Sequence, residues 1–321
     1  MLEGIGNETT AYAGQTAHAL DLVGLEETYS NAITVQTMVN NLNAHYGAGT
    51  YAMSSLQGDT AYGATSGDGP NAVIYNAKTL TLVASLEVPG TPTGANAASG
   101  SEVDRGVMRY QFRPAGGTAA DDFYVYVSHM KSSASGTSTE DQGDRNTEAT
   151  AIRNNEATLP ASASVMYMGD YNMDGNTEPG YQTMAAITSP TASGGKSQGA
   201  AIDPLNPSGA SMAWSGNSST AYKSMITEST QSTFSYRDDL QLTTQNVYNG
   251  TSGLAYVSGS EHAFGNDGTV AAGGDYWSGK APSSGDYSNL RYDLYEASDH
   301  LPVVADYTMA VAATPVPEAG T

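Results

Sequence analysis

Short apolar runs separated by long polar stretches make up the pattern of this chain. Apolar and polar side chains alternate over 105–112 and over 123–129, which predicts strands with two different faces. The run 165–168 is apolar throughout, as expected of a strand buried on both sides. The same pattern predicts further strands over 21–27, 71–75, 79–86, 239–243 and 301–307.

Two other segments have a helical pattern. Apolar residues recur at roughly helical spacing within 31–46, and 144–159 is also predicted to be helical. The stretches 188–232 and 258–290 are rich in Gly, Ser and Asn, which predicts surface loops. No repeat of fixed period is present. The pattern alone predicts a mixed α and β domain over 1–310, followed by a disordered Pro-rich tail over 311–321.

The composition limits which partners the protein can have. Twelve Lys and Arg oppose 33 Asp and Glu, for a formal net charge of −21. This charge repels a polyanion and disfavours binding to nucleic acid, except where a metal and a few arginines reverse the local sign. The chain has no cysteine, which excludes disulfides, thiolate metal sites and a cysteine nucleophile. No apolar run approaches the roughly 18 to 20 residues of a membrane span.

Polar side chains that suit catalysis follow several of the predicted strands. Asp299 and His300 lie together just before the last apolar run. A carboxylate can hold a hard cation, and a histidine exchanges its proton near neutral pH. Similar groups occur at 25–28, 128–132 and 169–172, each directly after an apolar run. Because such dipeptides are common, the ordered set is more informative than any one of them.

Five motifs in this order resemble the endonuclease/exonuclease/phosphatase superfamily, metal-dependent phosphoesterases that share a fold with pancreatic deoxyribonuclease. Residues 25–27 take the place of the family's Leu-Gln-Glu, and 129–132 match His-x-Lys-Ser. Residues 169–172 match Gly-Asp-x-Asn, 237–239 match Arg-x-Asp, and 298–302 match Ser-Asp-His-x-Pro. The resemblance implies a four-layer α/β/β/α sandwich of two mixed β-sheets with outer helices. By the same resemblance, the sequence is expected to lack the family's first strand, which carries an Asn.

The resemblance also implies roles for the metal ligands. Glu27 is expected to bind the divalent metal, with Glu26 as the alternative, because only one of two neighbours on a strand can face a site. Asp299 would contact the metal directly or through water. Hard oxygen ligands select Mg²⁺, with Mn²⁺ or Ca²⁺ as alternatives.

The remaining motif residues would act on the phosphoester. His300 would be the general base, with Asp239 fixing its tautomer, and His129 would bind phosphate or protonate the leaving group. Asp170 would orient the nucleophile or the metal, and Asn172 would hold a phosphate oxygen.

Arg105 and Arg145 are the candidate guanidinium contacts to phosphate. Each could equally balance local carboxylates in so acidic a chain.

The leading hypothesis is a divalent-metal-dependent phosphoesterase, acting on a phosphodiester or a phosphomonoester, with a nuclease disfavoured by the charge. The alternative is a catalytically weakened or inactive extracellular surface, matrix or filament-forming protein on the same fold, associating through an exposed sheet edge. Residues 236–240 and 264–268 resemble signatures of a secreted bacterial subgroup. Residues 314–321 resemble the start of a Pro-Glu-Pro sorting signal, which implies an extracellular or cell-surface location.

Overall fold

The computed structural model describes most of the chain outside several long connections. The described residues are 1–8, 13–15, 17–28, 31–56, 69–89, 106–132, 139–185, 200–212, 214, 220–228, 236–266, 268, 294 and 297–309. The predicted tail 311–321 and much of the two predicted surface loops lie outside these ranges.

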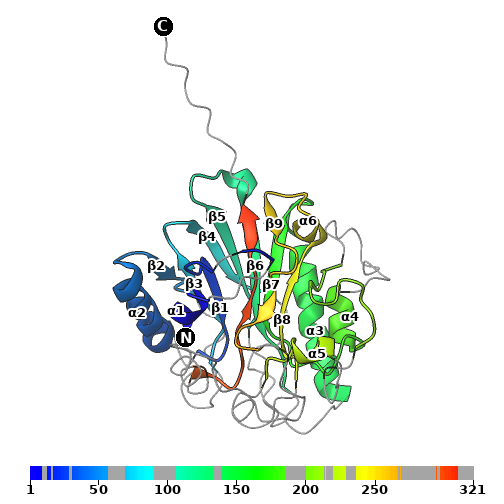
Figure 1. The fold of residues 1–321 in the computed structure, drawn as a ribbon. Coiled ribbons are helices and arrows are strands. Elements are labelled where there is room, and N and C mark those ends of the chain that lie inside the picture. Colours follow the sequence, from blue (N-terminus) through cyan, green and yellow to red (C-terminus); the bar gives the residue numbers. More distant parts are fainter. Residues whose placement is uncertain are drawn as a thin grey trace.

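A five-stranded sheet forms the centre of the molecule (Figure 1). Its strands lie in the order β4-β5-β6-β7-β8, and every neighbouring pair is antiparallel except β6 and β7, which are parallel. The 18-residue helix α3 (Thr139–Glu156) connects these two parallel strands, as such pairs require. The strands are β4 (Leu80–Glu87), β5 (Met108–Pro114), β6 (Phe123–His129), β7 (Ser164–Asp170) and β8 (Asp239–Thr243).

Smaller sheets complete the β structure. An antiparallel sheet of order β1-β3-β2 contains Leu22–Leu25, Ala72–Asn76 and Tyr51–Met53, respectively. The predicted strand 301–307 is instead two short strands with different partners. Of these, β11 (Val303–Val304) pairs with β10 (His262–Ala263), and β12 (Tyr307–Met309) pairs with β9 (Leu254–Tyr256).

Helices cover opposite sides of these sheets (Figure 1). On one side, α1 (Leu2–Ile5) and α2 (Gln36–Tyr46) lie beside the three-stranded sheet, and a π-helical turn (Asn31–Val35) leads into α2. On the other side, α3 (Thr139–Glu156) and α4 (Pro179–Ala185) lie beside β7 and β8. The remaining helices are short: α5 (Thr220–Lys223), α6 (Gln245–Tyr248) and a 3₁₀ turn (Ala119–Asp121). No described helix is both long and apolar enough to cross a membrane.

Alternation along β6, the middle strand, gives it two faces that are both largely buried. On β6, Val125 and Val127 belong to the apolar cluster that includes Val73 of the three-stranded sheet. Tyr126, between them, belongs to the cluster that contains residues of α3 and α4. Side chains of a strand point alternately to opposite faces, so the middle of this sheet is covered on both sides. This confirms the predicted mixed α/β class, whereas the complete four-layer order stays a prediction.

Candidate active site

The parallel pairing of β6 and β7 brings the first two candidate residues together. His129 and Asp170 are the last residues of their strands and lie directly opposite each other in the register. Nε2 of His129 is 3.3 Å from Oδ2 of Asp170, and only 2% of the histidine is exposed. Parallel neighbours end at the same edge of a sheet, and this edge is where the site is built.

The turn after β7 holds the Asp170 carboxylate in one orientation. The backbone and side-chain nitrogens of Asn172 both donate hydrogen bonds to that carboxylate, at 2.8 and 2.9 Å. Asn172 also donates to the carbonyl of Met130, and its φ of 49° is a left-handed conformation that asparagine tolerates. Gly169 has a φ of 140°, and a Cβ there would lie 1.8 Å from the carbonyl oxygen of Ser128. The close approach of β6 and β7 therefore requires glycine at this position.

A second histidine joins the same sheet edge from the C-terminal part of the chain. Asp239, the first residue of β8, lies opposite Asp170 in the register. Its Oδ2 is 2.7 Å from Nδ1 of His300. Burial by itself lowers the pKa of His300, but the Asp239 charge and hydrogen bond, with the charges of Asp170 and Asp238, raise the pKa to about 12. The imidazole is therefore protonated at neutral pH in these surroundings.

Both glutamates after β1 line the cavity at this edge, which also contains Asp239, Asp299 and His300. The expectation that only one could face the site assumed a continuous strand, but β1 ends at Leu25 and Glu27 has a φ of 53°. Oε1 of Glu27 is 3.7 Å from Nε2 of His129. Burial, together with the charges of Asp239 and Asp170, raises the pKa of Glu26 well above its usual value. The structure thus brings Glu26 close to the aspartates and Glu27 close to His129.

Two further acidic residues of the site were missed by the sequence analysis. Burial and the charges of Asp170 and Glu228 raise the pKa of Asp238 well above its usual value. Glu228 forms an isolated β-bridge with His300. Burial, with repulsion from Asp299 and Asp239, raises its pKa as well. Asp238 lies within the motif 237–239, in which only Asp239 was expected to have a role. Glu228 lies in none of the five motifs.

The structure places one candidate arginine in the protein interior. Arg145 of α3 is fully buried, its Nε donates to Glu178 at 2.5 Å, and its Nη1 donates to the carbonyl of Lys131 at 2.8 Å. It therefore supports the segment that follows His129. A contact of this side chain with phosphate stays a prediction, and Arg105 lies outside the described residues.

The donors at this edge fit a hard divalent cation. Carboxylates that follow β1, end β7 and begin β8 lie near one another, and the raised pKa values of Glu26 and Asp238 come partly from repulsion between these groups. A cation would relieve that repulsion. Within the described part of the chain, no group of three or more His, Asp or Glu side chains is arranged so that it could hold a metal by itself. Mg²⁺ commonly uses only one or two carboxylates and keeps several waters.

Comparisons with known proteins identify the fold. No protein-family model and no curated protein matches the chain. Solved structures do, among them the catalytic domain of human Nocturnin with bound sulfate, with a TM-score of 0.52 and 14% identity over 90% of this chain and 81% of that one. D. rerio TDP2 with a single-strand DNA product has a TM-score of 0.51 and 12% identity, covering 90% and 86% of the two chains.

Bacterial structures match equally well. The mannosyl-6-phosphatase of Bacteroides thetaiotaomicron has a TM-score of 0.51 and 13% identity, covering 90% and 86% of the two chains. An endonuclease/exonuclease/phosphatase family protein from the same bacterium has a TM-score of 0.51 and 14% identity, covering 91% and 84%. At such low identity the similarity establishes the fold alone. The chain has the fold of endonuclease/exonuclease/phosphatase proteins.

Proposed function

We propose that this protein is exported and acts outside the cell, and that it hydrolyses a phosphoester with the help of a divalent cation, with Mg²⁺ as the first candidate. One observation carries the proposal: two histidine–aspartate pairs lie side by side at one edge of the sheet. His129 contacts Asp170, Asp170 lies opposite Asp239, and Asp239 binds His300. Positioned groups that move protons on both sides of a reacting atom are what phosphoester hydrolysis requires.

Each residue of the site would have a separate role in hydrolysis. Asp239 holds the His300 ring in place through Nδ1, which leaves Nε2 to serve a water molecule or an oxygen of the substrate. As an imidazolium, His300 stabilises negative charge on phosphate, and it becomes a base only where the surrounding carboxylates are neutralised. A cation bound by Glu26 or Glu27, with Asp170 or Asp299, would supply that neutralisation and polarise the phosphoryl group. His129, opposite Asp170, would bind phosphate or give a proton to the leaving group.

The fold neighbours support a phosphate-centred reaction and leave the substrate open. They include a protein with bound sulfate, one with a DNA product and one named as a sugar phosphatase. The net charge of −21 favours a small phosphoester over a nucleic acid for this chain.

Hydrolysis of chromogenic phosphodiesters and monoesters tests the proposal. We expect Mg²⁺- or Mn²⁺-dependent turnover that is abolished by a chelator and reduced about 10²- to 10⁴-fold in His300→Ala, the usual contribution of a general acid or base. His45→Ala is the matched control, because His45 is a half-exposed residue paired with Glu3 on α1. Equal rates for the wild type, His300→Ala and His45→Ala on every ester would contradict the proposal.

A further inference from the structure

A pocket with polar walls lies at the end of the central sheet that is opposite the candidate active site. His129 and Asp170 are paired at the last positions of β6 and β7, whereas Phe123 and Ser164 are paired at the first. The two ends of β7 are about 20 Å apart at roughly 3.3 Å per residue. Three segments enclose a cavity of about 420 Å³ at the first positions: the turn before β6, residues 161–164, and residues 245–253. We call this cavity the polar pocket.

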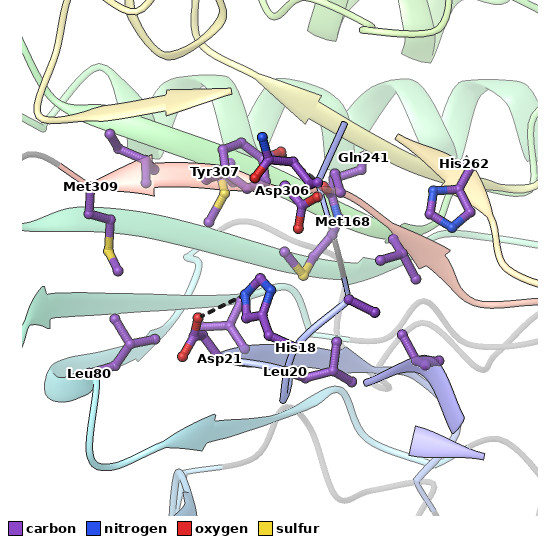
Figure 2. Close-up of a pocket in the computed structure, with 18 of the residues that line it drawn as sticks. His18, Leu20, Asp21, Leu80, Met168, Gln241, His262, Asp306, Tyr307 and Met309 are labelled. Carbon is purple, nitrogen blue, oxygen red and sulfur yellow. Dashed lines mark hydrogen bonds and ion pairs between the residues drawn. The ribbon is translucent and has the colours of Figure 1, made fainter. Parts of the chain in front are cut away.

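The polar pocket is separate from the cavities at the active site. The active-site cavity, which contains His300, shares Leu22 and Met168 with a smaller cavity. Figure 2 shows that smaller cavity between Asp21 on one side and Tyr307 on the other. The residues that line the polar pocket line neither of these two cavities. A ligand in the polar pocket would therefore leave the active site open.

Hydrogen bonds hold the walls of the polar pocket in place. The side-chain amide of Asn246 donates to the carbonyls of Ser162 and Ala163, at 3.1 and 3.2 Å. The hydroxyl of Ser252 donates to the carbonyl of Leu254 at 2.6 Å. Because these bonds join segments that are far apart in the chain or fix a turn, the walls are ordered before a ligand arrives. Such order reduces the entropy lost on binding.

Four polar side chains of the lining have no hydrogen-bond partner among the described residues: Ser162, Ser164, Gln245 and Asn249. Ser164 is the most informative of them, because it is only 6% exposed and still lines the pocket. Buried hydroxyls are normally hydrogen-bonded. The Ser164 hydroxyl is therefore available to a ligand, together with two side-chain amides that each offer both donors and an acceptor.

The charge of the polar pocket disfavours ions. Among the described lining residues, Asp122 has the one ionisable side chain, and no lysine, arginine or histidine is present to bind an anion. The Asp122 carboxylate already accepts hydrogen bonds from Arg113 and Gln111, which leaves little negative charge for a cation. The apolar side chains of the described lining are those of Ala120 and Ala161, so an apolar ligand would gain little there.

We infer that the polar pocket binds a neutral saccharide. Each sugar hydroxyl both donates and accepts hydrogen bonds, and a lining of amides and hydroxyls can satisfy both. The cavity of about 420 Å³ lies in the size range of small-molecule sites. A saccharide polymer bound there would hold the protein by the end of the sheet that is remote from the active site. The inference does not depend on hydrolysis, since it rests on a separate pocket.

Binding to oligosaccharides tests the inference. The fluorescently labelled full chain is applied to an array of neutral oligosaccharides of glucose, galactose, mannose and N-acetylglucosamine, together with acidic oligosaccharides of uronic acids. We expect binding to at least one neutral class and none to the acidic ones, which Asp122 and the net charge of −21 repel. Isothermal titration calorimetry then compares the bound oligosaccharide with its permethylated form. The permethylated form lacks hydroxyl donors and should bind at least about tenfold more weakly.

A matched pair of double variants tests the location. Gln245→Ala with Asn249→Ala removes two free amides of the pocket, four positions apart. Gln36→Ala with Asn40→Ala removes two exposed amides at the same spacing on α2, where they bond to each other at 3.0 Å. Circular dichroism checks that both are folded. Only the first should weaken oligosaccharide binding, by about tenfold, as expected for two lost hydrogen bonds.

Three results would overturn the inference. The first is the absence of binding to every neutral oligosaccharide of the array. The second is equal binding of the permethylated form or of acidic oligosaccharides, because hydroxyl recognition by an uncharged pocket would then not explain affinity. The third is equal affinity of the two double variants, because the saccharide would then bind elsewhere on the protein.

Discussion

Replacing Arg237 with alanine should destabilise the protein far more than the same change at Arg113. Both arginines make two hydrogen bonds to one aspartate: Arg237 binds Asp203 at 2.7 and 2.9 Å, and Arg113 binds Asp122 at 2.6 and 2.9 Å. The pairs differ in the burial of the arginine, because the Arg237 and Asp203 side chains are each 1% exposed while the Arg113 and Asp122 side chains are 32% and 6% exposed. The comparison therefore tests how the buried surroundings of an arginine change the cost of losing it.

The magnitude follows from what each substitution leaves behind. Without Arg237, the carboxylate of Asp203 loses its only close cationic partner among the described residues, and Glu261 loses a guanidinium 3.8 Å away. Breaking a buried pair by removing one partner costs about 3–5 kcal/mol. The guanidinium also lies 5.3 Å from the ring centre of Trp214, a contact that is lost as well. Arg113 is about one-third exposed, so water can replace it beside Asp122, which also keeps its hydrogen bond from Gln111; the loss should be about 0–1 kcal/mol, as for pairs at the surface.

Urea unfolding followed by tryptophan fluorescence and far-ultraviolet circular dichroism measures both variants. We expect the free energy of unfolding to fall by about 3–5 kcal/mol in Arg237→Ala and by less than about 1 kcal/mol in Arg113→Ala. Equal losses within about 0.5 kcal/mol would refute the reasoning that burial determines the cost.

Three further predictions concern the turn, acid stability and metal binding. Gly169→Ala forces a Cβ against the Ser128 carbonyl at a φ of 140°. The free energy of unfolding should therefore fall by about 1–3 kcal/mol or more in thermal unfolding, and an unchanged melting temperature would contradict this. The hydrogen bond from Arg113, opposed by burial, lowers the pKa of Asp122, so its stabilisation is present above the unfolded-state pKa of about 3.9 and disappears as pH falls through the lower folded-state pKa. The difference in unfolding free energy between wild type and Asp122→Asn should therefore vanish in acid, and a difference that grows there would exclude this account. Mg²⁺ at a hundredfold excess over its Kd should stabilise the wild type by about 2.7 kcal/mol in a thermal shift assay, and Asp170→Asn should lose most of that gain; equal gains would place the cation elsewhere.

Much of the secondary structure follows from local patterning. The predicted strand 239–243 coincides with β8, and the predicted strand 123–129 coincides with β6. The strands within 301–307 were harder to predict, because their bounds depend on partner strands far away in the chain. Asp306, between them, bonds with Val257 and Ser260. Period alone does not reveal such contacts.

The sequence predicted the site residues that lie in motifs directly after strands. It could not predict the role of a charged residue where that role depends on burial. The ends of β6 and β7 were expected to carry His129 and Asp170, and the structure brings these residues together. Asp238 and Arg145 are of residue types that usually lie at the surface, yet both are buried. Only the tertiary packing places Asp238 in the acidic site and makes Arg145 an interior partner of Glu178.

The parallel pairing of β6 and β7 limits how related chains can vary in length. These strands align without a register shift from Phe123 opposite Ser164 to His129 opposite Asp170. Inserting or deleting one residue within either strand would reverse which face each later side chain occupies, and so would separate the histidine from its carboxylate. Length changes should instead collect in the connection around α3, outside the paired residues.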